Sequence, residues 1–85
     1  MKISIEKVKC FPNPAQDYIN FNWTNPSSRE GQISIYNISG RRMFAAEFKS
    51  GSILRVNTGS WPAGAYYYRL KKAGNFLNGR FMLVE

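Results

Sequence analysis

Alternation of apolar and more polar side chains, with a period of two residues, is strongest over residues 64–85. The inward positions are Tyr66, Tyr68 and Leu70 in the first half and Leu77, Phe81 and Leu83 in the second half. This period predicts two half-buried strands, because successive side chains of a strand point to opposite faces. Residues 72–75 lie between the halves, and Gly74 can adopt the positive φ of a tight reversal. We therefore expect a β-hairpin at the C-terminal end.

Shorter segments of the same pattern fill the rest of the chain, and turn signals separate them at intervals of about ten residues. Further strands are expected at Lys2–Cys10, Tyr18–Trp23, Gly31–Ile38, Arg42–Phe48 and Ser52–Thr58. No window shows a sustained apolar period of about 3.6 residues, so we expect almost no helix. The sequence therefore predicts an all-β fold, an antiparallel β-sandwich in which each sheet has one buried and one solvent-facing side.

The strand pattern also predicts which side chains lie inside. In Tyr18–Trp23, the core face is expected to hold Ile19, Phe21 and Trp23, and the solvent face Asn20 and Asn22. In Lys2–Cys10, the apolar phase set by Ile3 and Ile5 changes at Val8 and Cys10. Such a phase slip is typical of a bulge or of an irregular approach to a short strand.

Corners and turns are marked by Pro, Asn and Gly. In Phe11-Pro12-Asn13-Pro14, two prolines remove two backbone donors and are expected to stop strand pairing. The amide of Asn13 is expected to bond to nearby backbone and to hold this corner. Gly40 is expected to take a positive φ in the turn over residues 37–41.

Length and charge limit the possible classes of protein. A chain of 85 residues predicts one domain with a modest core. The net charge of +7 is spread along the chain with no run longer than two, which favours a solvated surface over a nucleic-acid or lipid-headgroup patch. No apolar run approaches the roughly 20 residues of a membrane span. Residues 1–7 lack the apolar stretch of a signal peptide, so the chain is either cytosolic or a segment of a longer protein.

The groups that carry catalysis or bind metals are missing or scattered. The chain contains no histidine, a single cysteine (Cys10) and five acidic residues without ligand-like spacing. It also lacks a glycine-rich phosphate loop. We therefore expect no enzyme activity, no catalytic residues, no metal and no cofactor. A stacking platform for bases or sugars is a weaker possibility, because only Tyr67 of Tyr66–Tyr68 is expected to face outward and Trp61 is expected to plug the end of the sandwich.

Four motifs occur in order along the chain. They are Phe11-Pro12-Asn13-Pro14-Ala15 followed by Tyr18-Ile19-Asn20-Phe21, then residues 33–41 with Gly40, then residues 61–70 with Gly64 and Tyr66, and finally Gly79-Arg80-Phe81-Met82-Leu83-Val84. Over about residues 8–85, this order resembles the type A C-terminal sorting domain of type IX secretion system cargo proteins from Bacteroidetes, the Por secretion system sorting family.

The resemblance implies an Ig-like β-sandwich of about seven strands that acts as a non-catalytic sorting signal. Such a domain directs a covalently attached N-terminal cargo domain across the outer membrane. The implied partners are the translocon and shuttle proteins of the system and a surface sortase-like peptidase, which commonly removes the domain and joins the cargo to anionic lipopolysaccharide. The implied locations are the periplasm in transit and then the cell surface or the extracellular space, with no nucleic-acid partner and no membrane span.

The resemblance also supplies candidate sorting residues. They are Pro12, Asn13, Pro14, Gly40, Gly64, Tyr66, Arg69, Gly79, Arg80, Phe81, Met82, Leu83, Val84 and Glu85. Within the hairpin, Tyr66, Tyr68, Leu70 and Phe81 are expected to hold the sandwich. The residues expected to be free for recognition are Tyr67, Arg69, Lys71, Arg80 and the tail 82–85.

One departure and two alternatives accompany this interpretation. The end Val84-Glu85 differs from the basic or mixed apolar-basic tail that is common in the family. Because the family implies a larger protein, residues 1–85 are expected to be one domain of a longer secreted protein, with Met1 as an artificial start or a fragment boundary. The alternatives are a fibronectin-III-like spacer or carbohydrate-binding module of a secreted enzyme, using Trp61 and Tyr67, and nucleic-acid binding through the basic surface.

Overall fold

A computed structural model of the chain describes residues 7–24, 30–72 and 75–85, and these residues form an all-β sandwich. The strands are β1 (Lys7–Phe11), β2 (Tyr18–Thr24), β3 (Glu30–Tyr36), β4 (Arg42–Lys49), β5 (Ile53–Asn57), β6 (Gly64–Lys72) and β7 (Asn75–Leu83). The predicted fold class is confirmed. Within these three stretches, no helix is long and apolar enough to cross a membrane.

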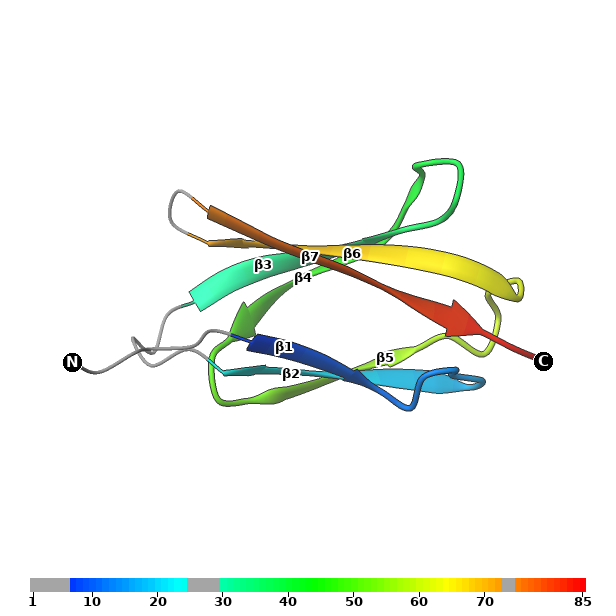
Figure 1. Ribbon diagram of the computed structural model, residues 1–85, viewed down its shortest axis with the longest axis horizontal. Helices are drawn as coiled ribbons and strands as arrows, with labels where there is room; N and C mark the ends of the chain where they lie inside the picture. Colours follow the sequence, from blue (N-terminus) through cyan, green and yellow to red (C-terminus); the bar gives the residue numbers. More distant parts are fainter. Residues whose placement is uncertain (1–6, 25–29, 73–74) are drawn as a thin grey trace.

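Two antiparallel sheets face each other across the core (Figure 1). The smaller sheet has the order β1-β2-β5, and the larger sheet has the order β4-β3-β6-β7. The predicted terminal hairpin is β6–β7, which is paired continuously from Gly64↔Leu83 to Lys72↔Asn75. Its turn at Gly74 lies outside the described residues. Among the described strands, β7 pairs with β6 alone, and it therefore forms one edge of the larger sheet.

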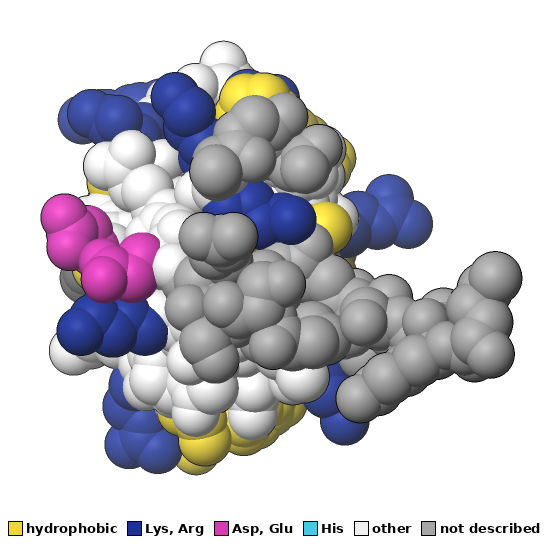
Figure 2. Space-filling model, turned by 90° about the vertical axis from the view of Figure 1, so that its left-hand side faces the viewer, with side chains coloured by type: hydrophobic (Ala, Val, Ile, Leu, Met, Phe, Trp, Pro, Cys, Tyr) yellow, Lys and Arg dark blue, Asp and Glu magenta, His cyan; other side chains and the backbone are white. Residues whose placement is uncertain are grey.

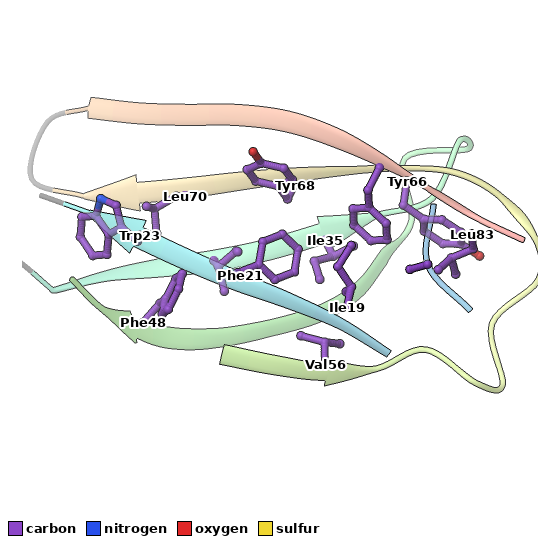
Figure 3. Close-up of a cluster of buried hydrophobic side chains, with 13 residues drawn as sticks. Ile19, Phe21, Trp23, Ile35, Phe48, Val56, Tyr66, Tyr68, Leu70 and Leu83 are labelled. Carbon is purple, nitrogen blue, oxygen red and sulfur yellow. The ribbon is translucent and has the colours of Figure 1, made fainter. Parts of the chain in front are cut away.

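The core lies between the inward faces of the two sheets (Figure 3). Ile19, Phe21 and Trp23 of β2 are fully buried, as the period of two residues predicts. The ring of Phe21 meets the rings of Tyr68 and Phe81 edge-on, at centroid distances of 5.1 and 5.8 Å. Aromatic pairs favour this geometry because the positive edge of one ring approaches the negative face of the other.

The predicted phase of the hairpin is confirmed. Tyr66, Tyr68 and Leu70 are buried, whereas Tyr67 between them is 42% exposed. In β7, Phe81 is buried and Arg80 is exposed. The hairpin therefore places one side in the core and presents the other side to solvent.

The expectation that Asn20 faces solvent is wrong, because its side chain is only 7% exposed. The Nε–H of Arg55, on the adjacent strand β5, donates a hydrogen bond of 3.1 Å to Asn20 Oδ1. The guanidinium of Arg55 also lies 4.2 Å from the ring centroid of Tyr18. A long side chain thus covers the outer side of β2, and alternation within β2 alone does not reveal this cover.

Most predicted strand boundaries differ by one residue from those of the structure, and one differs by two. The third strand was expected to extend to Ile38, but it ends at Tyr36, and Ile38 is 77% exposed in the following turn. The first strand is described only from Lys7, so the expected strand start at Lys2 and the alternation of Ile3 and Ile5 lie outside the described residues.

Candidate functional site

Three segments that are far apart in the sequence meet at one end of the sandwich, at the right of Figure 1. They are the corner of residues 12–15, the start of β6 and the end of β7. Leu83 is the Cα partner of Gly64 on one side, and it forms a parallel bridge with Ala15 on the other. The structure thus brings the first and last sequence motifs together.

Backbone and side-chain hydrogen bonds fasten the corner to the outer edge of β7. The Met82 N–H donates to Asn13 Oδ1 at 3.1 Å, the Ala15 N–H donates to the Met82 carbonyl at 2.8 Å, and the Val84 N–H donates to the Ala15 carbonyl at 2.8 Å. Asn13 does hold a corner, but its partner is 69 residues away rather than nearby backbone. The expectation of a partner nearby in the sequence is therefore wrong. The corner crosses from the smaller sheet to the edge of the larger sheet, and this brings Asn13 next to Met82.

The turn after β3 lies at the same end (Figure 1). Asn37 Oδ1 accepts hydrogen bonds from the N–H groups of Ser39 and Arg41, at 3.0 and 2.9 Å. Gly40 has a φ of 85°, which confirms its predicted left-handed conformation. This turn and residues 62–66 line a hollow of about 560 Å³.

Tyr66 packs inside the sandwich at this end. Its hydroxyl donates a 2.6 Å hydrogen bond to the carbonyl of Pro62, and its ring stacks on Phe81 at 5.7 Å. Burial raises the pKa of the Tyr66 hydroxyl. Trp61 is half-buried, and its ring centroid lies 5.3 Å from that of Tyr66, as expected of a plug.

Gly79 has a packing role that the sequence did not reveal. It is the Cα partner of Tyr68, whose ring lies against its inward side. A Cβ atom at Gly79 would lie 2.6 Å from Cε2 of Tyr68 and closer still to Cζ and the hydroxyl oxygen. A glycine inside a strand is a signal of such a close approach, but only the pairing register identifies the aromatic partner.

Exposure divides the candidate sorting residues into three groups. The exposed members are Pro12, Asn13, Pro14, Gly40, Arg69, Arg80, Met82, Val84 and Glu85, the half-buried members are Gly64 and Gly79, and the buried members are Tyr66, Phe81 and Leu83. Leu83 is only 2% exposed, so the expectation that the whole tail 82–85 is free for recognition is wrong at this position. Leu83 points inward because it shares the phase of Phe81. Met82 and Val84, by contrast, are 48% and 42% exposed.

The described residues contain no group of three His, Cys, Asp or Glu side chains that could hold a metal ion. Cys10 is half-buried, and burial raises the pKa of its thiol, which disfavours the nucleophilic thiolate. This end of the sandwich combines a hydrogen-bonded corner, a hydrogen-bonded turn, a hollow and exposed apolar side chains.

Two known proteins are similar to this chain, one in sequence and one in fold. An endo-acting ulvan lyase from Formosa agariphila is 32% identical over 78 residues, which are 92% of this chain and 15% of the relative. The crystal structure of dimeric latent PorU from Porphyromonas gingivalis superposes with a TM-score of 0.65 at 20% identity, over 99% of this chain and 10% of that one. The chain thus spans a small part of the length of each protein. A family model described as the secretion system C-terminal sorting domain matches residues 9–84, and the chain belongs to this family.

Proposed function

We propose that this domain is the address by which the type IX secretion system carries an attached protein across the outer membrane. Its family supports a sorting signal on a cargo protein and export to the cell surface or the extracellular space. The observation that most supports recognition of the folded domain is the convergence at one end of the corner, the 37–41 turn, Gly64 and the end of β7. A linear tail signal would not need these segments to meet.

The proposed cargo is a secreted enzyme joined on the N-terminal side. The relative that shares the domain is named an endo-acting ulvan lyase, and the match covers only 15% of it. β1 runs from the opposite end of the sandwich toward the corner (Figure 1). We call the end of the sandwich where residues 12–15, the 37–41 turn, Gly64 and the end of β7 meet the convergent end. Cargo attached before β1 would leave the convergent end uncovered.

The proposed partners are the translocon and shuttle proteins of the type IX system and a surface sortase-like peptidase. In this proposal, the domain passes through the periplasm and is removed at the surface. The peptidase acts on the N-terminal side of the described residues, because cleavage within a paired strand would first require that strand to leave its sheet.

The candidate sorting residues take two roles in this proposal. Contact with the machinery is assigned to the exposed side chains of the corner, to Arg69 and Arg80, and to Met82, Val84 and Glu85. Tyr66, Gly79, Phe81 and Leu83 keep the sandwich in shape, and Gly40 and Gly64 shape the turns at the convergent end. Met82 and Val84 are the strongest contact candidates, because they are exposed apolar side chains held in position by the corner.

The test is a periplasmic fluorescent reporter fused to residues 1–85 in a cell with an active type IX system. We expect the wild-type fusion to reach the surface or the medium. A Met82→Gln/Val84→Gln double variant should lower export by about tenfold, which corresponds to about 1.4 kcal/mol of lost binding. The measurement is the ratio of external to periplasmic reporter.

The matched control is Ile53→Gln, because Ile53 is also an exposed apolar side chain, at 61%, but lies on β5 away from the convergent end. This variant should be exported as well as the wild type. Thermal unfolding of each purified domain checks that all variants are folded. Unchanged export of the folded double variant would contradict the role given to Met82 and Val84, and retention of the wild-type fusion would contradict the proposed function.

A further inference from the structure

A row of basic and aromatic side chains crosses the outer face of the larger sheet. Tyr36 of β3 is the Cα partner of Tyr67 of β6, Arg42 of β4 lies opposite Tyr36, and Arg80 of β7 lies opposite Tyr67. The outward row is therefore Arg42, Tyr36, Tyr67 and Arg80. Its two arginines are separated by three interstrand steps, or about 14 Å.

The neighbouring row supplies a third guanidinium and a hollow. Arg69 Nε–H donates a 3.3 Å hydrogen bond to Asn78 Oδ1, and the Arg69 guanidinium lies 4.9 Å from the ring centroid of Phe76. These contacts hold the guanidinium beside a hollow of about 430 Å³. The hollow is lined by Tyr36, Tyr67, Tyr68, Arg69, Asn78 and Gly79. Its volume lies within the range of small-ligand sites.

These two rows carry three arginines and no acidic side chain. The residues paired in the second row are Ala45, Ser34, Arg69 and Asn78. Glu47 lies one row farther on, opposite Gln32. In the end view of Figure 2, the acidic side chains in view lie next to one another, with lysine or arginine side chains above and below them. Because the two rows contain three arginines and no acidic side chain, they are a local concentration of positive charge.

We propose that this face, defined as Arg42, Tyr36, Tyr67, Arg80, Arg69 and Asn78, binds a linear anionic polysaccharide such as a polyuronate. Guanidinium groups bind carboxylates through paired, charge-assisted hydrogen bonds. The tyrosine rings present flat apolar faces, which suit the apolar faces of sugar rings. A chain lying across the strands meets the two terminal arginines of the row in turn.

A polysaccharide suits the face better than other polyanions. The family places the domain at the cell surface or outside the cell, where polysaccharides are abundant. The face spans four hydrogen-bonded strands, with one register shift between Ile35 and Tyr36, so the sheet holds its side chains and an extended ligand needs no rearrangement of the backbone. This inference concerns the domain after export and does not depend on the recognition of Met82 and Val84.

The test uses purified domain and three immobilised probes: alginate, neutral dextran and single-stranded poly(dT). We expect binding to alginate at low salt, loss of this binding as salt screens the exposed charges, and no binding to dextran. Arg80→Gln and Tyr67→Ala should each weaken alginate binding by about tenfold. Tyr67→Phe should bind nearly as well as the wild type, because the ring face is kept.

Lys9→Gln is the matched charge control, because Lys9 is exposed on β1 in the smaller sheet. It removes one positive charge but should weaken alginate binding less than twofold. Equal losses for Lys9→Gln and Arg80→Gln would overturn the proposal in favour of nonspecific attraction by net charge. Tighter binding of poly(dT) than of alginate would overturn it in favour of a nucleic-acid surface, and absence of alginate binding by the wild type would remove it altogether. Thermal unfolding shows whether the Tyr67→Ala variant is folded, so that weaker binding is not mistaken for loss of the fold.

Discussion

At the scale of single residues, the pair of Tyr68 and Gly79 gives one candidate sorting residue a packing role. Tyr68 is buried, and its ring covers the inward side of Gly79 across the hairpin. The ring occupies the volume that any side chain at position 79 would need. Glycine is therefore required there because of its partner and not because of backbone conformation.

Gly79→Ala should destabilise the domain by about 1–3 kcal/mol, because the new Cβ atom forces the Tyr68 ring out of its position. Urea unfolding followed by tryptophan fluorescence measures the change. In a Tyr68→Leu background, the same substitution should cost less, since the smaller side chain leaves space. Equal costs in the two backgrounds would show that the ring is not the obstacle.

The buried hydroxyl of Tyr68 should make the free energy of unfolding depend on pH. Burial is the largest cause that raises the pKa of Tyr68 above its ordinary value of 10.0, and the nearby Cys10 adds to it. The unfolded chain therefore loses this proton first, and stability falls as pH rises above about 10. Its contribution is fully present below that pH. Tyr68→Phe should make the fall in unfolding free energy between about pH 8 and about pH 11 smaller, and identical slopes would contradict this assignment.

At the scale of elements, β7 is an edge strand whose end is nevertheless fixed. Its end is bonded to β6 on one side and to the corner on the other, through Asn13 and Ala15. Edge strands expose unpaired backbone groups that can join other chains. The corner satisfies these groups over Met82–Val84 and fixes the exposed side chains there in one arrangement.

Asn13→Ala should weaken the attachment of the end of β7 to the corner. The variant removes the acceptor of the Met82 N–H, so we expect a loss of about 1 kcal/mol in stability and faster hydrogen exchange at the Met82 amide than at amides of β6. Asn13→Asp keeps an oxygen acceptor and should preserve protection of the same amide. Exchange measured by NMR distinguishes the two variants. Unchanged protection of Met82 in Asn13→Ala would mean that Ala15 alone holds the strand end.

At the scale of the whole molecule, the features that could be predicted from the sequence are those encoded within one strand. The phases of Tyr66–Leu70 and Ile19–Trp23 follow from the period of two residues, and the turn at Gly40 follows from local conformation. The cover of Asn20 by Arg55 and the bond from Met82 to Asn13 depend on which strands become neighbours. No local pattern specifies these neighbours, so the convergent end became visible only in the fold.

This convergence changes how the tail should be tested for sorting. Deletion of Met82–Glu85 removes Leu83 from the core and the partners of the corner, as well as the exposed side chains. Loss of one buried leucine costs about 2–5 kcal/mol. The three hydrogen bonds to the corner add about 1 kcal/mol each, so the total loss reaches the lower part of the roughly 5–15 kcal/mol stability of small domains, and we expect a large unfolded fraction at physiological temperature.

We therefore expect the deletion and the Met82→Gln/Val84→Gln variant to fail in different ways. The deletion should lower the free energy of unfolding by more than about 3 kcal/mol and abolish export because the sandwich is lost. The double variant should stay within about 0.5 kcal/mol of the wild type, as surface substitutions usually do, and still lose export. Urea unfolding and the reporter assay on the same proteins separate the two cases. A truncated domain as stable as the wild type would show that Leu83 does not stabilise the core. The tail would then be interpreted as a linear signal that does not contribute to the fold.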